Sequence, residues 1–303
     1  MKRYTFVLIL AILSFGCVKE NIEDSIADEI RSNFDLFSIY GEVHNEMLQY
    51  AFDNFVAPET ITTQTEGIEY ILQLQQCGVD KLDISENNKG VLKYGMNHFK
   101  DLYITDNIHK MLAVKTRVID DEVITTNDIK QLIYEAYLAN DIDEFEYHSF
   151  NELIDCVVAN AQGLIGVQEF TDKINALIEC WEIKYADVDF SSLNQNGTVE
   201  SDVETLPDGA LGGAVLSVSI SSMEFWDDEI SRNETRAIPA FVGADIAGAI
   251  IGACVNGGIQ YLNKKEIDGE SLLYAAVGSA IVGSTGIVGK LGNWLTNLMN
   301  TML

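Results

Sequence analysis

Two apolar segments rich in glycine and alanine, residues 240–262 and 270–291, constrain the fold of this chain most strongly. They read AFVGADIAGAIIGACVNGGIQYL and ESLLYAAVGSAIVGSTGIVGKL, and the charged sequence NKKEIDG separates them. Glycine costs about 1 kcal/mol relative to alanine inside a helix, so close packing or lipid must offset the loss in helices of this composition. The pattern predicts a helical hairpin in this C-terminal segment, which we call the tail.

Small residues recur every four positions in both arms of the tail. Because four residues are slightly more than one helical turn, they stack into a groove on one face. A groove without large side chains lets another helix approach backbone to backbone, as in GxxxG packing. The candidate packing groove consists of Ala244, Gly248 and Gly252 in the first arm and Ala275, Ser279 and Gly283 in the second.

Three roles are open to the tail. It could insert into a membrane, since each arm has the roughly 20 residues that span the hydrocarbon core. It could associate with a second copy or a partner helix through residues 240–291, or it could be a helical pair buried against the rest of the chain. Asp245, Asn256 and Lys290 interrupt the apolar arms and favour the last two roles over insertion.

The chain before the tail has helical periodicity. Strand-like alternation is brief and occurs at Leu216, Val218 and Ile220. An N-cap is expected at Asn127, and a capping box at Ser149 and Glu152. We therefore expect an all-α fold. Apolar residues three and four positions apart predict helices at residues 49–56, 65–76, 88–118, 128–138, 153–158 and 170–185.

Turn-forming sequences indicate the boundary between this helical body and the tail. SSLNQNG at 191–197 and PDG at 207–209 are typical of loops. The expected organisation is a signal peptide at residues 1–16, a lipidated acidic tether with a first helix at 17–38, a helical body at 39–190, a loop-rich joint at 191–236 and the helical hairpin at 237–303.

The first 17 residues have the three parts of an export signal. A basic start precedes an apolar run at residues 5–13, and SFGC follows at 14–17. The apolar run is far shorter than a membrane-spanning helix, which favours cleavage. A cysteine after a small residue resembles a lipobox, whose cysteine receives a diacylglycerol before cleavage. The resemblance implies lipidation of Cys17; the alternative is ordinary secretory cleavage beside an incidental cysteine.

Further resemblances point to a bacterial surface. The sequence VKENIED at 18–24 resembles the surface-export signal of Bacteroidota-type lipoproteins, which implies outer-membrane residence and leaves open whether the protein lies at the cell surface. The sequence GEVHN at 41–45 and the tail are together similar to Bacteroidota lipoproteins of unknown function that combine a Gly-Glu-x-His-Asn motif with a glycine-zipper tail. That resemblance implies no activity. The tail alone also resembles the glycine-zipper core of class II bacteriocins, which are shorter and usually cationic.

The net charge and the cysteine spacing argue against two kinds of binding partner, nucleic acid and zinc. The formal net charge of −28 repels phosphate, so nucleic acid is not an expected partner. Four cysteines remain after Cys17, and they contain no zinc-like spacing. Two states are possible for Cys156 and Cys180: they could form a disulfide bridge, or both could be buried free thiols.

No constellation of residues predicts catalysis, a cofactor or a metal. His44 lies between Glu42 and Glu46, but residues two apart do not share a helix face, and a His-Asn pair capping a helix start is the preferred interpretation. The sequence DIDEFE at 141–146 lacks the glycine of an EF-hand and is interpreted as a solvated acidic loop. No HExxH, GxSxG, P-loop or Rossmann pattern occurs. We expect a non-enzymatic surface lipoprotein whose tail mediates association or docking; the alternative is a membrane-active, pore-forming or bacteriocin-like effector whose tail inserts into a target bilayer.

Overall fold

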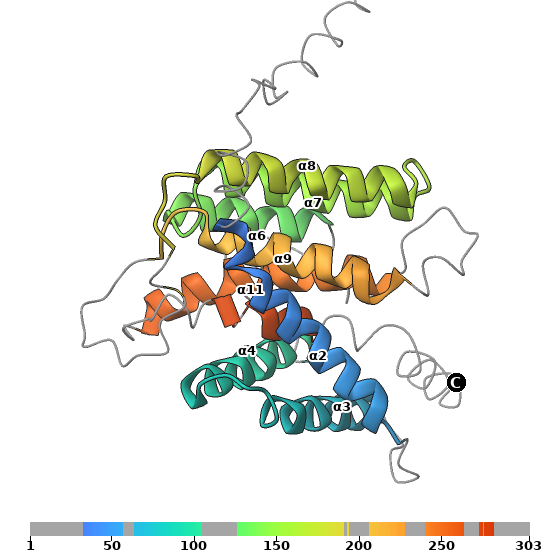
Figure 1. The fold of residues 1–303 in the computed structure, drawn as a ribbon. Helices are drawn as coiled ribbons and strands as arrows, with labels where there is room; N and C mark the ends of the chain where they lie inside the picture. Colours follow the sequence, from blue (N-terminus) through green and yellow to red (C-terminus); the bar gives the residue numbers. More distant parts are fainter. Residues whose placement is uncertain are drawn as a thin grey trace, which may run out of the picture.

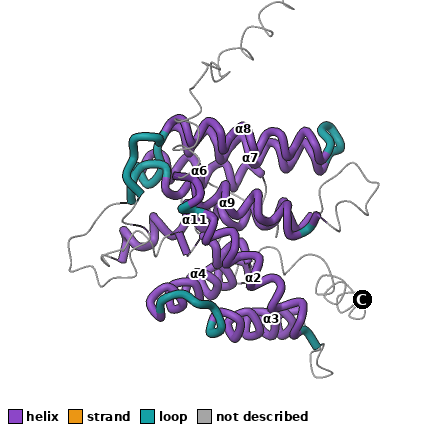
Figure 2. Tube along the Cα trace, viewed as in Figure 1, coloured by secondary structure: helices purple, strands orange, loops and turns teal. Residues whose placement is uncertain are grey.

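The described part of the chain is helical. The computed structural model describes residues 33–56, 64–104, 126–190, 193, 206–227, 240–263, 273–274 and 276–281. These residues contain no strand, and they form helices with short loops where the connections are described (Figure 2). The expected all-α fold is confirmed. The signal peptide, Cys17 and most of the acidic tether lie outside these ranges.

The helices agree with the periodicity of the sequence, although several begin earlier than expected. The helices are α2 (Ser38–Asn54), α3 (Gln64–Val79), α4 (Glu86–Ile104), α6 (Thr126–Ala139), α7 (Glu144–Ala161), α8 (Val167–Lys184), α9 (Ala210–Phe225) and α11 (Ala240–Asn263). Asn127 is not an N-cap, because α6 already begins at Thr126. In the second arm of the tail, residues 273–274 and 276–281 are helical.

The helices pack around α9 and α11, which lie in the middle of the molecule (Figure 1). On one side α7 and α8 lie next to each other, and on the opposite side α3 and α4 do so. The helix α2 crosses α9, while α11 contacts α6, α7 and α9. Buried apolar side chains from all these helices belong to one continuous core, so the first arm of the tail is part of the main body.

The helix α9 lies inside the segment 191–236, where we expected a loop-rich joint. That expectation is wrong for residues 210–225, as is the strand-like interpretation of Leu216, Val218 and Ile220. Residues 210–219 are buried without exception. A helix enclosed on all sides carries apolar and small residues around its whole circumference, so it has no polar face from which a 3.6-residue period could be recognised.

A tight turn sets the start of α9. Gly209 has a φ of +87°, and a Cβ atom there would lie 2.6 Å from the ring of Tyr185. Glycine therefore supplies both the left-handed backbone and the space for that ring. The indole Nε1 of Trp181 donates a hydrogen bond to the Gly209 carbonyl oxygen at 2.8 Å, which ties α8 to the start of α9.

The capping box of α7 lies six residues before the expected position. The Asp143 side chain accepts a hydrogen bond from the Glu146 backbone N–H at 2.9 Å, and the Glu146 carboxylate accepts one from the Asp143 N–H at 3.0 Å. Ser149 is buried in the middle of the helix, so the box expected at Ser149 and Glu152 is wrong. Both sequences have the right spacing, and the earlier one satisfies the free N–H groups.

Three cysteines are free thiols in different surroundings. Cys77 on α3 is exposed, whereas Cys156 on α7 and Cys254 on α11 are buried. Burial raises the pKa of Cys156 to about 11 and raises the pKa of Cys254 as well. Because Cys156 is free, the bridge between Cys156 and Cys180 is not formed.

Candidate functional site

The glycine groove of α11 is filled by the second arm of the tail. A Cβ atom on Gly248 would lie 2.8 Å from the carbonyl oxygen of Ser279 and 3.0 Å from Cα of Ala280. A Cβ atom on Gly252 would lie 2.6 Å from Cβ of Ser279. The two arms therefore approach backbone to backbone at Gly248, as the spacing of small residues predicts.

The other groove residues contribute less or lie elsewhere. Ala244 is half-buried, and Ala275 and Gly283 lie outside the described residues. Two glycines not assigned to the groove also make close contacts with the body: a Cβ atom on Gly243 would lie 2.9 Å from Cγ1 of Val157, and one on Gly278 would lie 2.8 Å from the Leu92 carbonyl oxygen. Of the three roles considered for the tail, this arrangement corresponds to a packed pair buried against the body.

Substituting Gly248 by alanine should separate packing from helix propensity. The added methyl would meet backbone atoms of the second arm, which cannot move aside as a flexible side chain can. We expect a loss of about 1–3 kcal/mol in the free energy of unfolding, measured by urea denaturation. Gly90 on α4 is the matched control, because a Cβ atom there meets nothing within 4 Å. Gly90→Ala should gain about 0.5–1 kcal/mol. Equal effects of the two substitutions would contradict the close approach.

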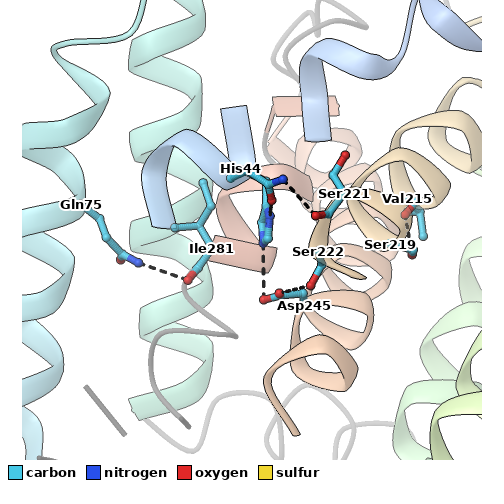
Figure 3. A network of polar contacts seen from close by, with 9 residues as sticks. His44, Gln75, Val215, Ser219, Ser221, Ser222, Asp245 and Ile281 are labelled. Atoms are coloured by element: carbon cyan, nitrogen blue, oxygen red, sulfur yellow. Dashed lines mark hydrogen bonds and ion pairs between the residues drawn. The ribbon is translucent and has the colours of Figure 1, made fainter. Parts of the chain in front are cut away.

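A buried polar network links α2, α9 and α11 (Figure 3). Nε2 of His44 lies 3.4 Å from Oδ1 of Asp245, and both side chains are fully buried. The Ser222 hydroxyl donates a hydrogen bond to the other Asp245 oxygen, Oδ2, at 2.5 Å. Each of the three helices supplies one member, so this network joins the first arm of the tail to the body.

The surroundings of His44 favour its protonated form, in which it pairs with Asp245. Burial alone would lower its pKa, but the charge and hydrogen bonding of Asp245, together with the hydrogen bond of Nδ1 to Asn45 Oδ1 at 3.0 Å, outweigh burial and raise the pKa above 6.5. His44 and Asp245 therefore form a buried ion pair. Such a pair is tolerated in a core because each charge compensates the other.

The GEVHN sequence at 41–45 is the part of α2 that contacts both α9 and α11. Gly41 packs against Ser221, where a side chain would overlap the hydroxyl, and its N–H donates to the Ser217 hydroxyl at 3.2 Å. Asn45 donates through Nδ2 to the Ser221 carbonyl oxygen at 2.9 Å. With His44, three of the five residues contact α9 or α11. The Gly-Glu-x-His-Asn motif and the glycine-rich tail thus meet in space.

The helix-cap interpretation of His44 and Asn45 is wrong. The helix α2 begins at Ser38, so both residues lie well inside it. Glu42 and Glu46 are exposed, and neither takes part in the network. Ser222 donates to Asp245 rather than to His44, so the histidine does not activate the hydroxyl as a base would. The arrangement links helices and has no features of a nucleophilic site.

A second buried carboxyl ties α7 to α9. Oε1 of Glu146 accepts a hydrogen bond from the Gly212 N–H at 2.8 Å, in the first turn of α9. Burial raises the pKa of Glu146 to about 7, although the N–H groups of Asp143 and Gly212 act in the opposite direction. The interpretation of residues 141–146 as a solvated loop is therefore wrong for residues 144–146, which begin α7, and Glu146 is buried. Glu146 therefore completes the capping box of α7 and also accepts a hydrogen bond at the N-terminus of α9, where the helix dipole is positive.

Other classes of site are absent from the described residues. Within these ranges no group of three or more histidine, cysteine, aspartate or glutamate side chains could hold a metal ion. A search of the same residues finds no helix with the length and apolarity needed to cross a membrane.

Comparison with known proteins identifies no relative. No family model, curated protein or solved structure matches this chain. The resemblance to Bacteroidota lipoproteins therefore stays a prediction.

The sequence contained one signal for the ion pair. Asp245 is an acid inside an apolar segment, and a charge buried with such a segment requires a partner. Its partner, His44, lies about 200 positions earlier on a different helix, so local spacing could not identify the pair.

Proposed function

We propose that this chain is a lipid-anchored outer-membrane protein without enzymatic activity, whose glycine-rich tail mediates association with a second copy. The observation that carries the proposal is the approach of α11 to the second arm at Gly248 and Gly252. A surface that packs backbone to backbone within one chain can make the same contacts between two chains when the arms are exchanged. Such an exchange needs no new interface.

The association can be tested by mixing isotope-labelled and unlabelled copies of the mature chain. We expect a dimer at high protein concentration, with inter-copy cross-links that join the first arm of one chain to the second arm of the other. Gly248→Leu should abolish these cross-links, whereas Gly90→Leu should leave them unchanged, because Gly90 faces open space. A chain that stays monomeric at all concentrations contradicts this proposal.

The anchor is tested by replacing Cys17. The mature native protein should carry the mass of a diacylglycerol at its first residue, and Cys17→Ser should release the protein from the membrane fraction. A diacylglycerol supplies two acyl chains, which anchor a protein stably, so loss of the lipid should be readily measured. Cys77→Ser is the control, since Cys77 is an exposed thiol of the body and its replacement should not affect fractionation. Unmodified mature protein, or retention of the serine variant, contradicts the anchor.

A second candidate function, membrane insertion, is favoured by the burial of α9 and α11. Residues 210–219 of α9 are buried throughout, and residues 242–254 of α11 are mostly buried and apolar or small, as a stored membrane-active segment would be. Dye release from vesicles of phosphatidylethanolamine and phosphatidylglycerol, measured with the full mature chain, tests this candidate. Release that is lost in Gly248→Leu supports insertion. No release at any ratio of protein to lipid rejects it.

A further inference from the structure

The contacts between the tail and the body are of two kinds. Most are apolar or small-residue contacts, such as Gly278 against α4 and Gly243 against α7. Contacts of this kind are non-directional, and another apolar surface can replace them. The polar contacts are specific: His44 pairs with Asp245, and Gln75 of α3 donates to the Ile281 carbonyl oxygen at 3.1 Å (Figure 3).

The ion pair differs from the other polar contacts in the effect of breaking it. While both charges are present, they compensate each other inside the core. If His44 loses its charge, the Asp245 carboxylate stays buried without a counter-charge, and if Asp245 loses its charge, buried His44 gives up its proton. Either loss removes the attraction between the two helices and leaves a buried polar group without its partner, which favours exposure to water. Asp245 is on α11, in the first arm of the tail, and His44 is on α2, in the body. Breaking the pair therefore separates the tail from the body.

The body has polar contacts of its own that do not involve α11. Glu146 binds the Gly212 N–H, and Trp181 binds the Gly209 carbonyl oxygen, so α7 and α8 are each joined to α9. Asn45 binds the Ser221 carbonyl oxygen and joins α2 to α9. These bonds persist when Asp245 leaves His44, and they hold α2, α7, α8 and α9 together.

We propose that the His44–Asp245 pair, with Ser222, is a latch that controls whether the glycine-rich arm α11 is docked in the body or released from it. Loss of either charge frees α11 while α7, α8 and α9 keep their packing. The inference deepens the proposed function, because a groove that is filled in the monomer must be uncovered before a second chain can use it.

The native cysteines provide the test. Cys254 lies on α11 and reports its release, Cys156 lies on α7 and reports on the body, and the exposed Cys77 shows that labelling works. The full chain is labelled with a maleimide in native buffer, and each site is followed by peptide mass spectrometry. In Asp245→Asn and in His44→Gln, we expect labelling of Cys254 to accelerate by ~100-fold or more, as the usual effect of breaking a buried ion pair implies. Labelling of Cys156 should change by less than about threefold, because charged groups of α8, Lys173 and Glu169, lie near this thiol and α8 stays packed on α7.

A double substitution distinguishes charge from packing. His44→Leu combined with Asp245→Val removes both charges of the pair and keeps side chains of comparable size, so Cys254 should return toward the protection of the native chain. The latch is contradicted if Cys156 and Cys254 accelerate together in the single variants, since α11 and the body then open as one unit. Continued protection of Cys254 in both single variants contradicts it equally.

The native chain gives an independent measurement if the single variants do not fold. In a urea series below the unfolding midpoint, Cys254 should become reactive at a lower urea concentration than Cys156. Coincident profiles contradict the latch. These measurements report conformation within one chain, so a latch that opens in a strictly monomeric protein would leave the inference standing and reject the association.

Discussion

Replacing Trp181 by alanine is expected to lower the free energy of unfolding by about 3–5 kcal/mol, among the largest effects of any single substitution in this chain. Trp181 is fully buried on α8, and its ring lies 5.2 Å from that of Phe37 and 5.4 Å from those of Tyr185 and Phe190. The residue therefore joins the beginning of the described chain to the loop after α8. Truncation would leave a cavity among aromatic rings that cannot collapse without moving three segments.

A conservative substitution separates the two contributions of Trp181. Trp181→Phe keeps an aromatic ring in the cluster but removes the donor to the Gly209 carbonyl oxygen. A buried acceptor without its donor costs about 1–3 kcal/mol, so this variant should be less destabilised than Trp181→Ala. Urea denaturation of both variants measures the difference. An alanine variant within about 1 kcal/mol of the native chain would show that the aromatic cluster is not a main support of the fold.

The second large effect is a loss of stability as the pH rises. The pKa of Glu146 is about 7 in the folded chain and about 4.5 when it is unfolded, so the folded state binds this proton more tightly. The free energy of unfolding should therefore fall between pH 4.5 and 7, by about 3 kcal/mol in total at 1.36 kcal/mol per pKa unit. His44 acts in the same direction at higher pH, because its pKa is raised above 6.5 and its contribution is lost as the pH passes the raised value.

Other charges do not reverse this trend. The net charge of −28 increases self-repulsion as carboxyl groups ionise. Lys93 lowers the pKa of Asp80, so this group alone would make stability increase with pH. The carboxylate is fully exposed, however, and water screens the pair.

Urea midpoints between pH 4.5 and 8 measure the effect, and Glu146→Gln is the control. The glutamine cannot titrate, so its profile should be flatter between pH 4.5 and 7 and retain the decline at higher pH that His44 causes. A native chain whose stability rises over this interval would contradict the prediction.

Much of the helical content could be predicted because most helices have one apolar and one polar face. The period was readable in α3, α4, α6 and α8, and the described ends lie within about a turn of the expected ones, except that the expected end of the 88–118 helix lies outside the described residues. The small-residue spacing at Gly248 and Gly252 also predicted close packing, although three roles for that packing remained open. Which role is realised depends on the residues that fill the groove, and these come from the other arm.

The features that could not be predicted depend on burial from all sides or on distance along the chain. The helix α9 has no polar face, so its start was visible only as the turn at residues 207–209. The capping box of α7 had two candidates with the same spacing, and local sequence cannot decide between them. The pairing of His44 with Asp245 and of Glu146 with the Gly212 N–H joins residues that are 201 and 66 positions apart.

The central position of α9 determines how this protein can be divided for experiments. A fragment that stops near residue 190 would lack the helix against which α2 and α8 pack, and it would expose their apolar faces to water. A peptide that begins near residue 237 would likewise lack that surface, and any lytic or aggregating behaviour it showed would belong to the peptide. Only preparations that keep α2, α9 and α11 in one polypeptide can report what the intact molecule does.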